Sequence, residues 1–327
     1  MRPIVFAVAM FLAGPALAQG GPSFDCSKAS NAVERAVCRD PALAKADRDL
    51  AAAYAALSAK LTAAGKEQLE KDQVRWIIER NRRCTGEADA VAYCLKEQYA
   101  GRLGTLRALS VGPTPAISTE RLANKGKVGK ITWSYDIAYP RFDGANADFS
   151  ALNAGFADAS RKAAADATPE SGPDDSREQE WTYEQSYTLA RPDADAMTVV
   201  WQYYGFTGGA HGYGATVCTL VDLRTGAAVG PEGVFSDGPQ WLSAMSEIVA
   251  RDLEKQFKQK PGFEDALEPR NLAKLLKEPE HYCWRADRLE LIFNAYEVGP
   301  YVSGPFEVDV PYQRLKPLLR ADGPIRR

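Results

Sequence analysis

The apolar residues of this 327-residue chain change their spacing about a third of the way along it. From Asp40 to about Leu109 they recur every three or four residues, as on one face of a helix. Later runs rich in Val, Ile, Thr and aromatic residues are bounded by Gly, Pro and Asp, which is typical of strands. The change predicts an α+β protein: a small all-α part, then an α+β part with a mainly antiparallel sheet.

The first part is expected to hold a short helix from about Asn31 to Cys38 and three longer ones. Asp40 can cap the first long helix with Pro41 at its first position, and Gly65 ends it. Its apolar stripe contains Leu43, Ala46, Leu50, Tyr54, Leu57 and Leu61. The second long helix carries Leu69, Gln73, Trp76 and Ile77, and the third carries Val91, Leu95, Tyr99, Leu103 and Leu106.

The second part is expected to alternate strands with helices. Predicted strands cover 130–139, 181–189, 197–206 and 216–223, with a final hairpin of 289–296 and 306–310. Predicted helices cover 149–167, 240–257, 271–276 and 312–319. Residues 168–180, rich in Pro, Gly and acidic residues, predict a mobile loop. The segment 111–128, with Gly112, Pro113 and Pro115, is interpreted as a linker between domains at 19–110 and 129–327.

The first 18 residues have the pattern of a secretory signal. Arg2 gives the positive start, Ile4 to Leu12 the apolar run, and Ala16-Leu17-Ala18 the cleavage site. No Cys directly follows the apolar run, and no other stretch is long and apolar enough to cross a membrane. We therefore expect a periplasmic or secreted protein without membrane insertion after cleavage.

The six cysteines all follow this signal, and an even number in an exported chain predicts structural disulfides. They are Cys26, Cys38, Cys84, Cys94, Cys218 and Cys283. In the helical part, antiparallel packing suggests that Cys38 pairs with Cys84 and Cys26 with Cys94. The four cysteines allow three connectivities, so the alternatives stay open.

Charge is divided unevenly along the chain. Residues 19–110 hold 15 Lys and Arg against 12 Asp and Glu, net plus 3, whereas 111–327 hold 24 against 31, net minus 7. An acidic second part argues against nucleic acid or an anionic membrane as partner and suits a cationic one. Acidity that serves only solubility is an equally common explanation.

Little in the sequence points to catalysis. The chain has two histidines, His211 and His281, and none of the common nucleophile, phosphate-loop or metal-protease motifs. A zinc site needs three or four ligands, and the cysteines are better explained as disulfides. We therefore predict no enzyme activity, no metal and no cofactor. Whether two carboxylates lie at the separation needed for glycoside hydrolysis depends on the three-dimensional structure. The same question arises for almost any protein with many Asp and Glu residues.

Two Gly-rich loops are the candidate binding elements. The first runs from Gly208 and Gly209 through His211 to Tyr213, between two predicted strands. The second, residues 297–304, joins the last two strands and displays Tyr301, and Tyr296 and Pro300 are further candidate binding residues there. Aromatic residues on such loops offer contact area at low entropic cost, although glycines that adopt positive φ in a hairpin explain the first loop equally well. The two loops form one binding edge if the sheet brings them together.

A helix-end cluster in the first part contains Trp76, Arg80, Asn81 and Arg83. Trp76 continues the apolar stripe of Leu69 and Gln73, so a core position explains it better than a site. Trp76 and Arg80 are kept as further candidate binding residues.

The helical part resembles the N-terminal domain of the LprI-type lysozyme inhibitors from about Phe24 to Leu109. The resemblance combines four cysteines with a Q-x-x-W-x-x-x-R stretch from Gln73 to Arg80. It also includes Asp25, Ala29, Val33-Glu34-Arg35-Ala36-Val37, Leu43, Asp47, Leu50, Tyr54, Tyr99 and Arg102. The resemblance implies a helical, envelope-exported protein, in a family some of whose members inhibit lysozyme.

The second part resembles the domain shared by the lysozyme-sensing anti-sigma protein RsiV and some peptidoglycan deacetylases, over about 129–319. The resemblance depends on Gly208-Gly209-Ala210-His211, on Val221-Asp222-Leu223-Arg224-Thr225-Gly226 leading to Val234-Phe235, and on Ala295-Tyr296-Glu297 with 299–304. No deacetylase domain or membrane helix accompanies it, so only lysozyme recognition is implied.

Both resemblances imply lysozyme as the partner, and many lysozymes are cationic. We therefore expect an exported protein that binds lysozyme and covers its active-site cleft with the loops near His211 and Tyr301. The alternative is a non-catalytic module that binds peptidoglycan or maintains the envelope.

Overall fold

The computed structural model describes residues 21–59, 61, 63–110, 115–143, 147–170 and 178–326. The predicted signal, residues 1–18, lies outside these residues, as do Gly112 and Pro113 of the predicted linker and 171–177 of the predicted loop. Among the described helices, none combines the length and the apolarity that crossing a membrane requires.

The chain clusters into two compact units, one of residues up to 52 with 77–100, the other of residues 53–76 with 101–327. These units differ from the predicted domains because the three long helices each contribute residues to both. The boundaries 19–110 and 129–327 stay a prediction.

The predicted helices of the first part are present, but the first long helix ends at Ser58 and not at Gly65, which lies in the first turn of the next helix. They are α1 (Ala32–Arg39), α2 (Pro41–Ser58), α3 (Ala63–Arg83) and α4 (Ala88–Leu109), after a short 3-10 turn η1 (Cys26–Lys28). Asp40 caps α2 as expected, because its Oδ1 accepts the backbone N–H groups of Ala42 and Leu43 at 2.8 and 3.3 Å. Asn31 does the same for α1, with Oδ1 accepting the N–H of Glu34 at 2.9 Å.

The suggested disulfide pairing in the helical part is wrong. Cys26 is bonded to Cys38, and Cys84 to Cys94. Both bridges are local, since the first spans α1 and the second spans the turn between α3 and α4, with sequence separations of 12 and 10 residues. The third bridge, Cys218–Cys283, joins residues 65 apart. The prediction that all six cysteines form structural disulfides is confirmed.

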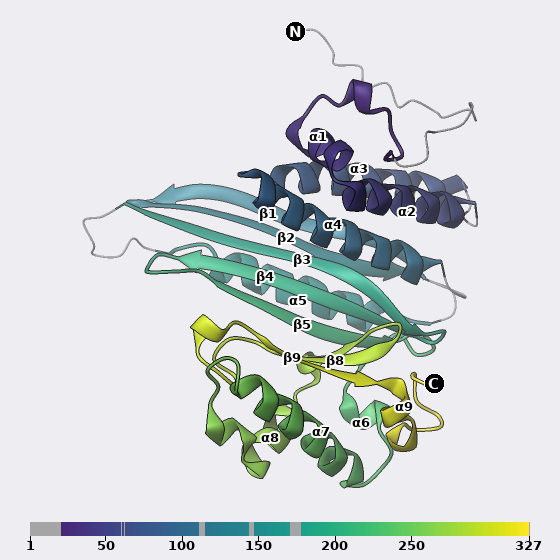
Figure 1. Ribbon diagram of the computed structural model, residues 1–327, viewed down its shortest axis with the longest axis vertical. Helices are drawn as coiled ribbons and strands as arrows, with labels where there is room; N and C mark the ends of the chain where they lie inside the picture. The colour runs from purple at the N-terminus through teal and green to yellow at the C-terminus, as the bar shows by residue number, and fades with distance from the viewer. Residues whose placement is uncertain are drawn as a thin grey trace. The chain divides into compact units, whose positions relative to one another are not determined.

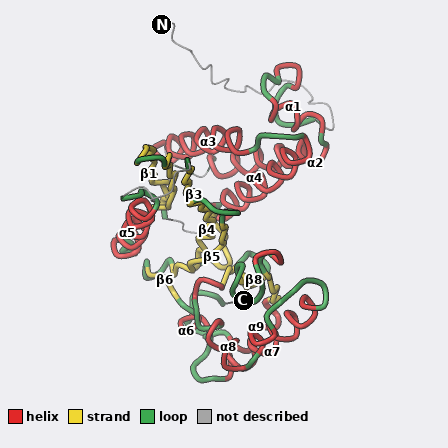
Figure 2. Tube along the Cα trace, turned by 90° about the vertical axis from the view of Figure 1, so that its left-hand side faces the viewer, coloured by secondary structure: helices red, strands yellow, loops and turns green. Residues whose placement is uncertain are grey.

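The larger sheet contains six strands in sequence order. They are β1 (Ala116–Val128), β2 (Ile131–Asp143), β3 (Gln179–Asp193), β4 (Ala196–Thr207), β5 (Tyr213–Asp222) and β6 (Ala227–Val229). Every neighbouring pair is antiparallel except β2 and β3. A parallel pair needs a crossover, and α5 (Ser150–Asp166) lies within it. Figures 1 and 2 show α5 beside the strands, where Phe149, Leu152 and Ala164 join a core with Ile137, Val199 and Trp201.

The smaller sheet contains β7 (Tyr282–Trp284), β8 (Arg288–Phe293) and β9 (Phe306–Pro311), all antiparallel. Its apolar face packs with α7 (Gln240–Phe257) and α8 (Pro269–Leu275), as Figure 1 shows, in a core that includes Trp241, Met245, Leu291, Phe293 and Phe306. A small cluster of Val200, Cys218, Cys283 and Ile292 connects it to β4 and β5. The predicted α+β class with a mainly antiparallel sheet is confirmed.

Some elements differ from the predictions. Residues 116–128 form β1 rather than a linker, because the strand is an edge strand whose polar side chains hide the strand pattern. The short β6 and β7 and the helix α6 (Pro231–Val234) were not predicted. The expected closing helix is two short pieces, α9 (Tyr312–Leu315) and η5 (Lys316–Leu318), and further 3-10 turns are η2 (Glu264–Leu267), η3 (Pro279–His281) and η4 (Tyr301–Ser303).

Candidate binding surface

The two predicted loops meet at one end of the sheets. The β4–β5 loop supplies His211 and, at the start of β5, Tyr213; the β8–β9 connection supplies Tyr296, Tyr301 and Val302. We call these five residues the aromatic edge. Figure 1 shows both connections within the strand-rich part of the chain. The sequence predicts one binding edge only if the sheet brings the two loops together. In the structure, residues of the two loops are in direct contact.

His211 and Tyr301 provide that contact. Their rings are stacked, with centroids 3.8 Å apart and an interplanar angle of 17°. The Tyr301 hydroxyl donates a hydrogen bond of 2.8 Å to the carbonyl oxygen of Gly212, and Tyr296 lies 5.9 Å from Tyr301 between ring centroids. The loops therefore form one surface, not two independent tips.

Several large side chains of the edge are exposed to solvent. Tyr213 is 54% exposed, Tyr296 61% and Val302 83%. Tyr204, which lies on β4 shortly before the first loop, is 47% exposed. Single exposed apolar residues are normal, but a group of them is typical of a contact surface. Tyr side chains are also enriched among the residues that dominate binding energy.

Glycines shape the first loop. Gly208 and Gly209 have φ of +83° and +102°, a conformation that residues with a Cβ rarely adopt. At Gly212, an added Cβ would lie 2.6 Å from the Tyr204 hydroxyl oxygen and 2.8 Å from the Gly205 carbonyl oxygen. Gly208 and Gly209 thus permit the positive φ that the hairpin interpretation requires, and Gly212 leaves room for the Tyr204 ring.

Asn294 and Glu297 support the second loop from below. Asn294 Oδ1 accepts the N–H of Thr216 on β5 at 2.8 Å, and its Nδ2 donates to the Thr216 carbonyl at 3.1 Å. The Glu297 carboxylate accepts the N–H of Asn294 at 2.6 Å. This network ties the base of the second loop to the strand that leaves the first. Sequence analysis did not single out Asn294, for which the signal is a polar residue directly after the apolar run of β8, and it included Glu297 only among the residues of the resemblance.

His281 lies buried beside this network, 2% exposed. Its Nδ1 is 3.0 Å from the Ile292 carbonyl oxygen and 3.7 Å from a carboxylate oxygen of Glu297. Burial raises the pKa of Glu297, and His281 opposes that shift. The chain's second histidine is therefore a structural residue.

Tyr296 has a left-handed backbone, with φ of +75°, the one described residue other than glycine with positive φ. For a bulky L-residue this conformation costs about 1–2 kcal/mol. Its backbone N–H donates to the Gly299 carbonyl at 2.9 Å, which holds the tight turn. Strain of this kind at an exposed aromatic residue is a feature of functional surfaces.

The remaining predicted residues occupy other environments. Pro300 precedes η4 and is half-buried. Trp76 is half-buried, while Arg80 is only 7% exposed. Arg80 Nη1 donates to the Tyr99 hydroxyl at 2.9 Å, which donates to Asp47 Oδ1 at 2.9 Å. These positions of the resemblance thus stabilise the helical part from within, and a buried Arg80 offers little to a partner.

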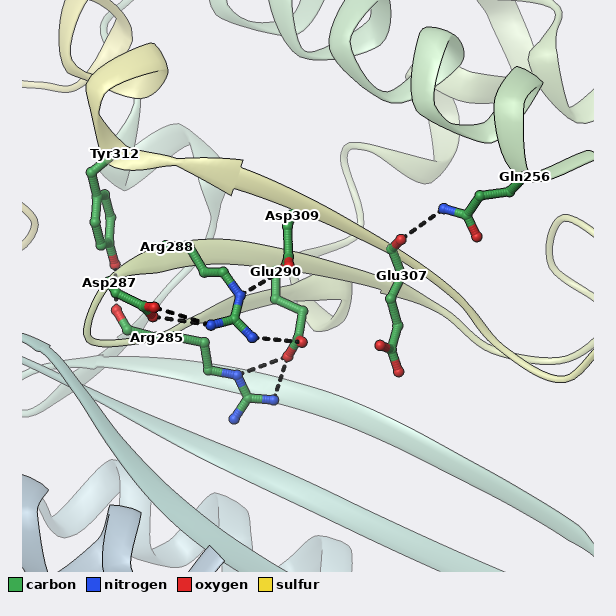
Figure 3. Close-up of polar contacts among 8 residues, drawn as sticks. All are labelled: Gln256, Arg285, Asp287, Arg288, Glu290, Glu307, Asp309 and Tyr312. Carbon is green, nitrogen blue, oxygen red and sulfur yellow. Dashed lines mark hydrogen bonds and ion pairs between the residues drawn. The ribbon is translucent and has the colours of Figure 1, made fainter. Parts of the chain in front are cut away.

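Several carboxylates lie close together on the face of the smaller sheet opposite its apolar face (Figure 3). We therefore compared this group with the carboxylate pair that glycoside hydrolysis requires. Glu290 is bound by Arg285 at 2.5 Å and lies 3.5 Å from Arg288, which also binds Asp309 at 2.7 Å. The pKa of Glu307 is raised, first by burial and then by Glu290 and Asp309. The arrangement is an ion-pair network. Among the described residues, no group of three or more His, Cys, Asp or Glu side chains is placed to hold a metal.

Comparison with known proteins finds two family matches. Residues 26–106 match the model of the lysozyme inhibitor LprI, and residues 232–313 match DUF3298, a family of unknown function. No curated protein matches the chain.

Two solved structures of DUF3298 family members are similar to this chain. One, from Pseudomonas aeruginosa PAO1, is 20% identical with a TM-score of 0.43, and the match covers 64% of this chain and 95% of that one. The other, from Bacteroides fragilis NCTC 9343, is 16% identical with a TM-score of 0.42, covering 63% and 95%. The predicted layout, an LprI-type part from about Phe24 to Leu109 followed by an RsiV-like part over about 129–319, is confirmed as an LprI lysozyme-inhibitor domain at 26–106 and a DUF3298 domain at 232–313.

Proposed function

We propose that this protein is an exported envelope protein that binds lysozyme and inhibits it by laying the aromatic edge across the active-site cleft. The observation that carries the proposal is the LprI match over residues 26–106, which supports a lysozyme-inhibitor-like role. Three disulfides suit a protein that works in an oxidising compartment outside the cytoplasm. On this proposal the protein presents a surface and catalyses no reaction.

The aromatic edge is the proposed contact because it combines exposure with a fixed shape. The His211–Tyr301 stack and the Asn294–Thr216 hydrogen bonds hold the loops before any partner arrives. A preformed surface loses less conformational entropy on binding than a loose one. An interface of ordinary size buries about 800 Å² on each partner, more than five side chains supply, so neighbouring residues must contribute.

Charge favours the encounter. The segment 111–327 carries 24 Lys and Arg against 31 Asp and Glu, net minus 7, and a cationic lysozyme would be attracted to it. The attraction should weaken as salt rises, because exposed charges are screened over roughly 10 Å at 0.1 M ionic strength.

The test is a lysis assay in which cell-wall suspensions are cleared by lysozyme, with and without a stoichiometric excess of the protein. The parent should slow clearing. The double variant His211→Ala/Tyr301→Ala should bind lysozyme at least about 30-fold more weakly, since central Tyr anchors are worth about 2 kcal/mol or more. Clearing at an unchanged rate with the parent protein rules out inhibition.

A matched control distinguishes the two parts of the chain. Tyr93 on α4 is 70% exposed and belongs to the LprI segment. Tyr93→Ala should leave inhibition intact; if it abolishes inhibition while the double variant inhibits normally, the helical part binds lysozyme and the edge does not.

Pull-down on purified sacculi tests the alternative module that binds peptidoglycan. Retention on sacculi without affinity for lysozyme supports that alternative and contradicts the proposal.

A further inference from the structure

A second candidate site lies away from the aromatic edge, in a cleft of about 430 Å³. Its walls come from α5, from β3 to β6 and from η3. We call it the α5 cleft and define it by Phe156, Ser160, Gln185, Trp201, Tyr203 and Glu280, which supply its rings and polar groups. The volume lies in the range of small-molecule sites, about 300–1,000 Å³.

Three aromatic rings form one wall. Phe156 meets Trp201 edge-on, with centroids 5.0 Å apart at 77°, and Trp201 stacks with Tyr203 at 6.5 Å and 16°. Each ring fixes its neighbour, so the wall is preformed. The faces of such rings carry negative electrostatic potential, which attracts cations.

The cleft offers the Gln185 side-chain oxygen and the Glu280 carboxylate as acceptors, beside the hydroxyls of Ser160 and Tyr203, which can accept as well as donate. Gln185 is 5% exposed, and its Nε2 donates weakly to the Ala138 carbonyl and to Ser160 Oγ, at 3.4 and 3.3 Å. No described residue donates to the Gln185 side-chain oxygen or bonds the Tyr203 hydroxyl. Neither atom is among the fully buried polar atoms of the described residues that lack a partner, so solvent reaches both, and a ligand that brings donors can bond them in place of water.

Charge points the same way. Among the described residues that line the cleft, Glu280 is the one carboxylate and no Lys, Arg or His is present. Burial, together with the nearby Tyr183 and Glu280, raises the pKa of Tyr203, which therefore stays neutral. An anionic ligand would meet repulsion without any compensating cation, and a neutral ligand would leave Glu280 unused.

We propose that the α5 cleft binds an organic cation, an alkylammonium or guanidinium group, against the Phe156–Trp201–Tyr203 wall, with Glu280 as counter-charge and Gln185 as acceptor. The group can be a free amine or the side chain of Lys or Arg in a polypeptide. The site is independent of the aromatic edge and of the lysozyme proposal.

The test is an NMR titration of the full-length mature protein, following the Trp201 indole N–H and the Gln185 side-chain amide. The probes are n-butylammonium, n-butylguanidinium, the neutral n-butanol and the anionic butyrate. The cations should bind about tenfold more tightly than butanol, and butyrate should not bind. Adding N-acetyl-lysine methylamide separates the sources: tighter binding than butylammonium indicates a polypeptide side chain, and weaker binding a free amine.

Glu280→Gln keeps the shape of the exposed rim and removes its charge, so it should weaken cation binding about fivefold and leave butanol unchanged. Glu278→Gln, an exposed change two residues away and outside the lining, is the control and should have no effect. Butanol binding as tightly as the cations, no shift with any cation, or equal effects of the two variants would each overturn the proposal.

Discussion

The side-chain amide of Asn294 hydrogen-bonds both backbone groups of Thr216, 78 residues earlier in the chain, at 2.8 and 3.1 Å. Thr216 lies on β5 just after the loop of His211, and Asn294 lies just before the loop of Tyr301. The Asn294 side chain therefore makes the two hydrogen bonds that a residue of a neighbouring strand would make to Thr216, and it links the starts of the two loops to each other. The His211–Tyr301 stack joins the same two loops.

Asn294→Ala should destabilise the protein by about 1–3 kcal/mol, because the N–H and C=O of Thr216 lose their partner. Exchange of the Thr216 amide hydrogen should accelerate in parallel. Denaturant unfolding and hydrogen exchange measure both effects. Asn124→Ala, which removes an exposed Asn bonded only to its neighbour Lys125, is the control and should cost less than about 0.5 kcal/mol. Equal losses in the two variants would contradict the role of Asn294.

Tyr296→Gly should be more stable than Tyr296→Ala by about 1 kcal/mol. Glycine adopts the φ of +75° without the cost of a Cβ, whereas Ala keeps that cost and loses the ring. Urea unfolding of the two variants measures the difference. Both variants should bind lysozyme less well than the parent, since both remove the exposed ring. A Gly variant less stable than the Ala variant would show that the turn is not strained.

The disulfides should contribute unequally to stability. In the chain-entropy model, closing a loop of 65 residues stabilises by about 4 kcal/mol and a loop of 12 by about 3 kcal/mol. Cys218→Ala/Cys283→Ala should therefore lower the free energy of unfolding more than Cys26→Ala/Cys38→Ala. It also removes a fully buried bridge between the sheets, which adds to the loss. Calorimetric melting of both variants compares them, and the reverse order would refute the expectation.

Glu307→Gln should stabilise the protein at neutral pH and lose that advantage in acid. Burial, with repulsion from Glu290 and Asp309, raises the pKa of Glu307 above its ordinary value of 4.5, so the folded state holds the proton more tightly than the unfolded chain. The stability that protonated Glu307 contributes is fully present below the ordinary pKa, and it is lost as pH rises through the raised pKa of the folded state.

The gain from Glu307→Gln at pH 7 should stay below about 1 kcal/mol because the side chain is partly exposed and screened. Urea unfolding at pH 7 and at about pH 4 measures the change. Glu254→Gln on the exposed face of α7 serves as control. A gain that is the same at both pH values would exclude titration of Glu307 as its cause.

Tyr99→Phe should cost about 1–3 kcal/mol, because the hydroxyl that joins Arg80 to Asp47 disappears and both buried charged groups lose a hydrogen bond. Tyr93→Phe, on the same helix and 70% exposed, should change stability by less than about 0.5 kcal/mol. Thermal unfolding compares the two. A small loss in Tyr99→Phe would mean that Arg80 and Asp47 find other partners.

The sequence by itself determined the class of fold and most of its elements. Periodicity located α2, α4 and the strands β2 to β5, because a helix or strand that covers a core must repeat its apolar residues with the period of its backbone. It also identified both loops of the aromatic edge, since Gly, Pro and exposed aromatic residues mark connections. The strand β1 was not predicted, because an edge strand rich in Lys, Arg and Glu lacks that apolar period.

Tertiary structure alone decided which distant residues meet. The disulfide partners, the stack of His211 on Tyr301 and the bonds from Asn294 to Thr216 all follow from strand pairing and loop paths, and no local spacing encodes them. The α5 cleft likewise exists only because a helix, four strands and a 3-10 turn converge. Local patterns report what each segment buries, whereas contacts between segments depend on how all of them pack together.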